Sequence, residues 1–276
     1  MYTLKREMLA QIIRLLVEGN SIRSAERITG VHRDTIMRLA VRVGKNCDRI
    51  HDATMRGFHS RLIQCDEIWS YVGKKQGRLT DGEKRNPALG DRYIFVGLDA
   101  ESKLVPTYNV GKRDSANTSQ FMGALKERLN GNGRVQLTTD GFSAYEDAVN
   151  WHFGRDVDFA QQIKTYAATI AGAGRYSPPR VTGMVSTVIS GRPDPAYIST
   201  SYVERQNLTM RMCMRRLTRL TNAFSKKLEN LKAAVALHFA YYNFARVHQT
   251  LRVTPAMEAG LTDHVWTMSD FMEEVR

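Results

Sequence analysis

The apolar side chains near the N-terminus recur at helical spacing. Residues 4–18 place them every three or four positions, which predicts an amphipathic helix that ends at Gly19. Ser21 is a favourable N-cap for a second helix, and Gly30 turns the chain into a third helix over about 32–44. Two short helices joined by a glycine-containing turn are typical of a helix-turn-helix. The expected core positions of this pair are Ala25, Ile28, Val31, Ile36 and Leu39.

The outer face of the third predicted helix is rich in side chains that can contact DNA. Arginine and threonine side chains can reach base edges and phosphates from a helix in the major groove. A purely structural helical hairpin has the same apolar pattern, and it is the alternative. The outer-face residues are His32, Arg33, Thr35, Arg38 and Arg42.

The apolar period changes from helix to strand after residue 60. The segment "RLIQCDEIWSYVGKK" predicts a strand, and the polar stretch 73–91 predicts a hairpin loop. The segment "DRYIFVGLDAESKLVPTYNVGKR" predicts two strands around a turn at 100–103. "SANTSQFMGALKERLNGNG" predicts a helix closed by Gly131, and "RVQLTTDGFSAYEDAVNWH" predicts a strand, a glycine turn and another helix. This order of elements indicates a mixed α/β fold.

The region 155–200 has a weaker pattern. "FAQQIKTYA" is compatible with a strand, whereas "AGAGRYSPPR" and "SGRPDPAYIST" contain glycine and proline residues that favour loops. We therefore expect 155–200 to be an insertion or loop region. Beyond it the sequence predicts a long helix over 201–220 and a second helix over 225–245. A last short helix is expected to begin at Thr254 and Pro255.

The distribution of charge indicates a polyanionic partner. The net charge is +12, and the sequence pI is about 9.8. Residues 1–64 contain 12 Lys and Arg against 6 Asp and Glu, residues 201–252 contain 10 against 2, and the rest of the chain is close to neutral. Two basic ends around a neutral middle are typical of a nucleic-acid-binding protein. A solvated basic surface without a special partner is the alternative.

Other features of the composition point to a cytoplasmic protein. No stretch approaches the roughly 20 apolar residues that cross a membrane, and the N-terminus lacks the apolar core of a signal peptide. The three cysteines, Cys47, Cys65 and Cys213, have neither zinc-site spacing nor the pattern of a disulfide framework. Such cysteines suit a reducing cytoplasm.

Three acidic residues have settings that suggest chemistry. Asp66 lies within a mostly apolar strand, Asp140 follows a strand, and Glu204 precedes five arginines in "SYVERQNLTMRMCMRRLTRL". If they meet in space, carboxylates without His or Cys suit magnesium or manganese, and two such ions can support phosphoryl transfer. Strand alternation predicts that Glu67 points away from Asp66. For each acid, a capping or salt-bridging role is the alternative.

The segments that carry these acids resemble a known family. "CDEIWSYVGKK", "TTDGFSAY" and "YVERQNLTMRMCMRRLTR" resemble, in order, the three catalytic blocks of DDE-type insertion-sequence transposases, above all those of the insertion-sequence 1 family. "YYNFARVHQTLRVTP" is similar to the tail of many integrase-like transposases, so the resemblance covers about residues 60–256. It implies an α/β, ribonuclease-H-like (integrase-like) catalytic domain. It also implies that Asp66, Asp140 and Glu204 are the catalytic residues and bind two Mg²⁺ ions, for which Mn²⁺ can substitute.

The resemblance also implies a domain organisation. We expect a small all-α helix-turn-helix domain over 1–58, a catalytic domain over 59–262 and a C-terminal tail over 263–276. Members of the insertion-sequence 1 family often carry a zinc-binding module before the helix-turn-helix. This chain has no cysteine before Cys47, so we expect that module to be absent.

The residues after Glu204 are expected to hold DNA. In DDE transposases a Lys or Arg seven residues after the Glu contacts the element end, and Arg211 has that position here. At 3.6 residues per turn Arg215 returns to nearly the same helical face. We therefore expect Asn207, Arg211, Arg215 and Arg216 to grip DNA beside the metal site. A solvated basic helix is the alternative.

The resemblance implies a complete reaction. The helix-turn-helix would bind terminal inverted repeats, water would cleave a strand to free a 3′-hydroxyl, and that hydroxyl would attack target DNA. The partners would be DNA and at least one further copy of the chain, in the bacterial cytoplasm and at the nucleoid. Two other functions stay open. A non-catalytic helix-turn-helix regulator predicts that the three acids do not converge, and a ribonuclease-H-like nuclease predicts cleavage without joining.

Overall fold

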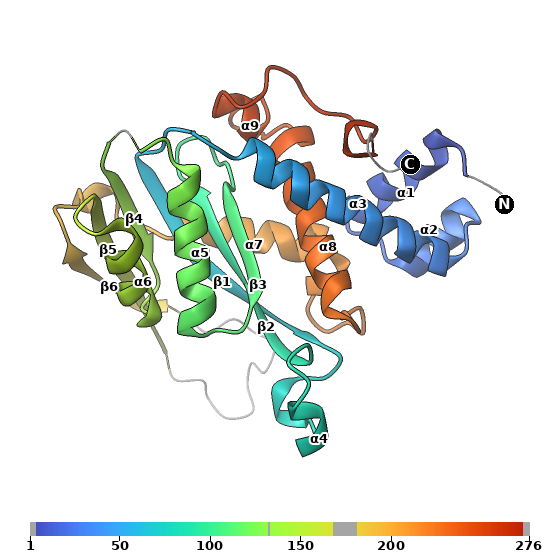
Figure 1. Ribbon diagram of the computed structural model, residues 1–276, viewed down its shortest axis with the longest axis horizontal. Helices are drawn as coiled ribbons and strands as arrows, with labels where there is room; N and C mark the ends of the chain where they lie inside the picture. The colour runs from blue at the N-terminus through green and yellow to red at the C-terminus, as the bar shows by residue number, and fades with distance from the viewer. Residues whose placement is uncertain (1–3, 132, 168–180, 273–276) are drawn as a thin grey trace.

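A six-stranded mixed sheet lies at the centre of the protein. The computed structural model describes residues 4–131, 133–167 and 181–272. The strand order is β3-β2-β1-β4-β5-β6, in which β4 and β5 run parallel to β1 and the other neighbouring pairs are antiparallel (Figure 1). The strands are β1 (Leu62–Val72), β2 (Gly90–Asp99), β3 (Thr107–Gly111), β4 (Val135–Thr139), β5 (Val157–Tyr166) and β6 (Val181–Ser190).

Helices cover both faces of this sheet. Figure 1 shows α5 (Ser115–Arg128) and α6 (Ala144–Phe153) in front of the strands and α7 (Ser201–Cys213) behind them. Alternation along β1 sends Cys65 into the core with α5 and α6, and Ile68 into the core with α7 and α8 (Leu228–Ala240). Because both faces are covered, β1 has apolar side chains in both cores, although it also carries the polar residues Gln64, Asp66 and Glu67.

The N-terminal helices agree in part with the sequence prediction. They are α1 (Arg6–Val17), α2 (Ile22–Thr29) and α3 (Arg33–Thr54). The side chain of Ser21 accepts a hydrogen bond from the backbone of Ser24 at 3.0 Å, as a cap should. Two predictions were wrong: α3 extends well past residue 44, and Ile28 is 54% exposed rather than part of the core.

The N-terminal helices share a core with the last part of the chain. Buried residues of α1 and α3 pack with Ala236, Phe244 and Phe271, and α3 lies along α8. The chain continues from α8 through a π-helix, Tyr241–Ala245, to α9 (Pro255–Glu258), where Thr254 is the predicted N-cap. A 3-10 turn, Asp270–Met272, ends the described part of this segment.

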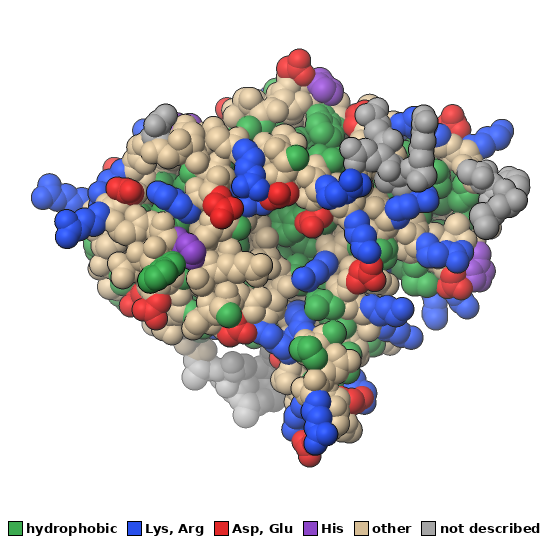
Figure 2. Space-filling model, in the orientation of Figure 1, with side chains coloured by type: hydrophobic (Ala, Val, Ile, Leu, Met, Phe, Trp, Pro, Cys, Tyr) green, Lys and Arg blue, Asp and Glu red, His purple; other side chains and the backbone are tan. Residues whose placement is uncertain are grey.

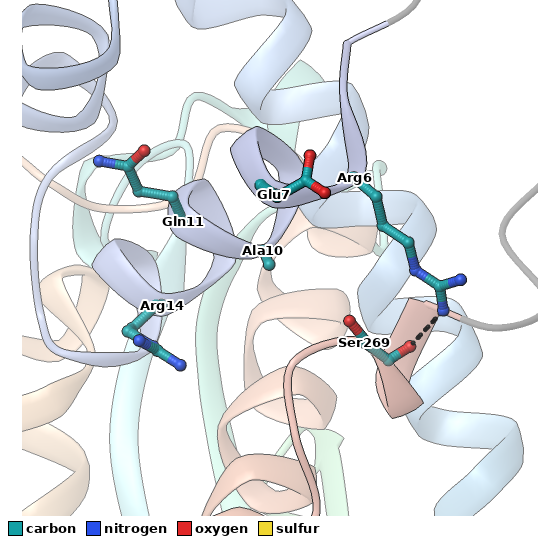
Figure 3. Close-up of a pocket in the computed structure, with 6 residues that line it drawn as sticks. All are labelled: Arg6, Glu7, Ala10, Gln11, Arg14 and Ser269. Atoms are coloured by element: carbon teal, nitrogen blue, oxygen red, sulfur yellow. Dashed lines mark hydrogen bonds between the residues drawn. The ribbon is translucent and has the colours of Figure 1, made fainter.

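The C-terminal segment returns to the first helix. Arg6 Nη2 donates a hydrogen bond to the backbone oxygen of Ser269 at 3.3 Å, beside a hollow of about 350 Å³ (Figure 3). Lysine and arginine side chains cover much of the helical part in Figure 2, and they also cover the projection that carries α4 (Asp81–Lys84). Within the described ranges, none of the helices combines the length and the apolar character that crossing a bilayer requires.

The region 155–200, expected to be an insertion or loop, contains two strands, and the first of them, β5, coincides with the segment "FAQQIKTYA" that was compatible with a strand. β5 and β6 extend the sheet beyond β4 and form its edge. β6 has no clear sequence pattern because its side chains, including Met184 and Val185, are mostly exposed, so no buried face imposes an apolar alternation. The predicted hairpin loop 73–91 likewise holds a 3-10 turn, Gln76–Arg78, and α4. The segment "AGAGRYSPPR" lies outside the described residues.

The long helix predicted over 201–220 ends early. α7 stops at Cys213, because Met214 leaves the helical region at φ −109° and ψ 102°. A 3-10 turn over Arg215–Leu217 follows. Met214 and Leu217 are both buried against the sheet, so the chain bends to keep these apolar side chains in the core. The prediction that Arg215 returns to the face of Glu204 on one helix is therefore wrong.

Candidate active site

Two neighbouring parallel strands bring the first two predicted acids together. β1 pairs with β4 so that Gln64 lies opposite Thr138. Asp66 and Asp140 each follow two residues later, and the register therefore carries both to the same place at the carboxyl end of β4. Ligand sites commonly form at the carboxyl ends of parallel strands. One carboxylate oxygen each from Asp66, Glu67 and Asp140 lies within 4.8 Å of the others.

Glu67 belongs to this acidic cluster, contrary to the sequence prediction. β1 is regular, and the Glu67 side chain does go to the opposite face from that of Asp66, where it is only 2% exposed. However, β4 ends at Thr139, so no strand separates the two faces of the sheet at Asp140. Asp140 can therefore stand near both neighbours. Strand alternation predicted the direction of Glu67 but not its proximity to the other acids.

Arg113 neutralises part of the cluster. It follows β3, and its Nε donates to Glu67 Oε2 at 2.9 Å while its Nη2 donates to Asp140 Oδ2 at 3.1 Å. Its guanidinium also lies 3.9 Å from the ring centroid of Phe142, which holds it by a cation–π contact. This arginine was not among the sequence predictions, because its position after a strand carries no recognisable pattern.

Asp66 is held by two hydrogen bonds and has a raised pKa. Its Oδ2 accepts from Asn207 Nδ2 at 2.8 Å, and its Oδ1 accepts from the backbone of Glu67 at 2.8 Å. Burial, and then the charges of Asp140 and Glu67, raise the pKa of Asp66 to about 7. Asn207, which the sequence suggested as a DNA contact, is buried, and its amide nitrogen donates to this carboxylate.

Glu204 lies beside the cluster in the first turn of α7. Its charge is near enough to contribute to the raised pKa of Asp66. Among the described residues it is not part of the group within 4.8 Å, and its carboxylate is paired with Lys164 of β5. Thr200 Oγ1 also donates to Glu204 Oε1 at 2.7 Å. The sequence analysis did not single out Lys164, although its segment, "FAQQIKTYA", was compatible with a strand.

The donor atoms of this site fit a hard divalent cation. All of them are carboxylate oxygens, without His or Cys, which favours magnesium or manganese over zinc. Glu67 Oε1 is buried and has no partner of ideal hydrogen-bond geometry among the described residues, but the Tyr145 hydroxyl lies near enough to interact with this carboxyl group. Arg113 donates hydrogen bonds to one oxygen of Glu67 and one of Asp140. A cation that binds Asp140 Oδ2 would have to replace the hydrogen bond from Arg113 to that oxygen.

We expect cation binding to depend on pH through Asp66. A carboxylate must lose its proton to bind a metal, and the pKa of about 7 means that protons compete below that pH. The apparent affinity for Mn²⁺ should therefore rise by up to about tenfold per unit from pH 5.5 to 7 and level off above. Calorimetric titration at four pH values would measure this. A flat profile across pH 5.5 to 8 would contradict it.

Without metal, the stability of the folded protein should fall as the pH rises, whereas the affinity for metal should increase. Because the folded-state pKa of Asp66 lies above its unfolded value of 3.8, its contribution to stability is complete below pH 3.8 and is lost as the pH rises towards 7. Burial is the largest cause of this raised pKa, and the charges of Asp140, Glu67 and Glu204 add to it. Asp66→Asn should therefore be the more stable protein at pH 8 in EDTA, which urea unfolding would show.

The predicted DNA-contacting arginines divide into three places. Arg33, Arg38 and Arg42 are exposed on α3, where Arg38 Nη2 donates to Thr35 Oγ1 at 3.4 Å. Arg211 lies near the acidic cluster: burial and Arg219 lower its pKa, and the charge of Asp66 opposes them. Beyond the end of α7, the remaining two, Arg215 and Arg216, turn towards α2 and α3.

A cleft of about 960 Å³ lies between α2, α3 and the segment that joins α7 to α8. Arg33, Arg215 and Arg216 all line it, although the first is some 180 residues from the others in sequence. Arg216 is partly buried, and its Nη1 donates to Ser225 Oγ at 3.0 Å. The structure thus brings together arginines that the sequence assigned to two separate DNA-binding elements.

Comparison with known proteins gives weak structural likenesses only. No protein-family model matches the chain, and no curated protein matches it. It is similar to the Mos1 strand transfer complex (17% identity, TM-score 0.25, 58% of this chain and 59% of that one). It is also similar to the Mos1 mariner paired-end complex with Mn, at 16% identity and a TM-score of 0.23, over 57% of this chain and 60% of that one. A third likeness is to a piggyBac transposase synaptic complex with hairpin DNA, at 9% identity and a TM-score of 0.39, over 100% of this chain and 72% of that one.

The solved structures to which the chain is similar are thus transposase complexes. The chain spans less than two thirds of the length of the two Mos1 chains given above. At these identities and TM-scores, the likenesses establish neither the fold nor the activity of this protein. The geometry of the acidic cluster and of the cleft has to support any function on its own.

Proposed function

We propose that the protein is a DNA transposase of the DDE type, similar to the insertion-sequence 1 family. It would bind the ends of a mobile element, cleave a DNA strand and join the freed 3′-hydroxyl to target DNA. The observation that carries the proposal is the β1–β4 register, which places Asp66 and Asp140 together with Glu67 and Glu204 close by.

The sheet supports a ribonuclease-H-like catalytic domain. Three antiparallel strands followed by two parallel ones, in the order β3-β2-β1-β4-β5, are the arrangement that such a domain requires. We assign this domain to residues 59–262, with a helix-turn-helix domain over 1–58 before it and a tail over 263–276 after it. The shared core of α1, α3 and α8 would hold the first two parts together.

In this proposal Asp66, Asp140 and Glu204 hold two divalent cations, Mg²⁺ or Mn²⁺. When bound, the cations would supply electrostatic stabilisation to the attacking and leaving oxygens of phosphoryl transfer. Asn207 fixes the orientation of Asp66 through its hydrogen bond. Lys164 holds Glu204 in the absence of a cation and balances its charge. Arg113 does the same for Asp140 and Glu67.

The DNA contacts follow from the positions of the arginines. Arg33, Thr35, Arg38 and Arg42 would face the element end from α3, the third helix of the N-terminal part. Arg211 would hold a phosphate next to the acidic cluster, near enough to Asp66 to interact with its charge. Arg215 and Arg216 would contact DNA in the cleft. Two element ends must be paired for transposition, so the active species would be at least a dimer, in the bacterial cytoplasm and at the nucleoid.

A nuclease is the second candidate, because the same acidic cluster would support hydrolysis without joining. The test is a strand-transfer assay on labelled DNA that carries the native element end and its flank, with Mg²⁺. The wild type is compared with Glu204→Gln, and with Asp81→Asn as a control that removes an acid whose side chain is 95% exposed. Binding to the same DNA is measured in parallel.

The outcomes of this assay separate the candidates. Joined products from the wild type and from Asp81→Asn, but not from Glu204→Gln, would support the transposase. Cleavage without joining would favour the nuclease. Binding by all three proteins without any chemistry would leave the non-catalytic regulator and would remove the role proposed for the three acids.

A further inference from the structure

We propose that the cleft between α2, α3 and α8 binds a stretch of DNA strand whose bases are unpaired. This site is separate from the acidic cluster, and the choice of DNA as its ligand rests on the proposed function. Three features carry the inference. They are the positive charge of the lining, its apolar side chains, and the bend of the chain at the end of α7, which separates this cleft from the acidic cluster.

The rim of the cleft is cationic. Arg23 of α2 and Lys226 of the loop before α8 join the three arginines already placed there, and both are exposed. No Asp or Glu is among the described residues that line the cleft. Five cations from three separate parts of the chain, without an acid between them, fit a polyanion such as a phosphodiester backbone. A second copy of this chain fits poorly, because each copy carries a net charge of +12.

The floor of the cleft is apolar, and this distinguishes single strands from duplex. In a duplex the base faces are stacked on one another, so they could not contact the apolar side chains between the cations. An unpaired strand offers both phosphates for the rim and base faces for the floor, and aromatic side chains stack on such bases. The apolar lining residues include Met37, Val41, Met214, Phe224, Ala234 and Leu237.

A buried polar group also lines the cleft. His238 is only 2% exposed, and its Nδ1 has no hydrogen-bond partner among the described residues. Burial lowers the pKa of His238 to about 3, so the ring is neutral at physiological pH. Its Nε2 lies 3.4 Å from Gln206 Nε2. The neutral ring therefore adds a polar group but no charge to the lining of the cleft.

The cleft is distinct from the acidic cluster. Met214 ends α7 and directs Arg215 and Arg216 away from the helical face on which Glu204 and Arg211 lie. None of the acidic residues of the cluster lines the cleft. A strand held here would therefore belong to a part of the DNA other than the phosphodiester at the acids.

The test measures binding by fluorescence anisotropy in EDTA, so that it is independent of the acidic cluster. The probes are a labelled 20-nucleotide oligothymidine and a 20-base-pair duplex. The variant is Arg23→Gln with Lys226→Gln, and the matched control is Arg78→Gln with Arg85→Gln, two exposed arginines near α4. Both double variants remove two positive charges. Phe224→Leu tests the aromatic ring that lines the cleft, one face of which stacks on Tyr71 with 5.0 Å between the ring centroids.

We expect the cleft variant to bind the oligothymidine at least tenfold more weakly than the control does. The slope of log K against log salt should fall by about 1.4, since each phosphate contact with a single strand contributes roughly 0.7. Phe224→Leu should weaken single-strand binding roughly fivefold or more, because stacking is worth about 1–3 kcal/mol per base. Duplex binding should change by much less in all three proteins.

Other results would overturn the proposal. An equal loss in the cleft and control variants would mean that only net charge matters. An equal loss for duplex and single strand would mean that the cleft grips a backbone without sensing unpaired bases. If single-strand binding behaves as expected but the strand-transfer assay shows no chemistry, the cleft stands and the proposed enzymatic function fails.

Discussion

Asp140→Asn should reduce metal-dependent DNA cleavage by at least about a thousandfold, because loss of a charged metal ligand removes several kcal/mol of electrostatic stabilisation. The substitution should leave the fold intact. Asp140 Oδ1 accepts a hydrogen bond from the backbone of Phe142 at 3.0 Å, and the amide oxygen of Asn can accept the same bond. Only the second oxygen, which accepts from Arg113, becomes a donor.

The measurement that separates this loss from unfolding is the stabilisation by metal. With Mn²⁺ at 100 times its Kd, the wild type should gain about 2.7 kcal/mol of unfolding free energy, and Asp140→Asn should gain almost none. Its stability in EDTA should equal or exceed that of the wild type, since one of several like charges is removed. Asp81→Asn is the matched control. An Asp140→Asn protein that keeps both cleavage and the Mn²⁺ shift would exclude Asp140 as a ligand.

Gly44→Ala should destabilise the protein by roughly 3 kcal/mol, in the range of severe overpacking. Gly44 lies in the middle of α3, where α8 passes directly over it. A Cβ at this position would stand 2.2 Å from the backbone oxygen of Ala233 and 2.8 Å from its Cα. Backbone cannot rotate away as a side chain can, so the two helices would have to separate along the core that joins the N-terminal helices to the rest of the chain.

Urea unfolding would measure this change, and Gly82→Ala is the control. Gly82 lies in the short helix α4, and a Cβ added there meets nothing within 4 Å. That control should be unchanged or stabilised by up to about 1 kcal/mol, because alanine favours a helix more than glycine does. A Gly44→Ala protein as stable as the wild type would mean that α3 and α8 can move apart without cost.

The sequence determined the local features of this protein. Apolar periodicity predicted α1, α2 and the central strands, and turn chemistry predicted the caps at Ser21 and Thr254. The motifs also selected Asp66 and Asp140, which the sheet brings together. These features depend on residues that are neighbours along the chain, so short-range patterns carry them. β6 escaped prediction because its exposed side chains lack a buried face.

The tertiary structure decided which distant residues meet. The β1–β4 register set the position of Asp140 relative to Glu67, and packing against the sheet ended α7 at Cys213 rather than near Leu220. Arg113 and Lys164 became partners of the acids through loops and strands far away in sequence. The cationic cleft exists because α3 packs against both α2 and α8, which brings the segment between α7 and α8 close to the N-terminal helices. Strand register and helix packing follow from the shape of the whole core, which no periodicity along the chain encodes.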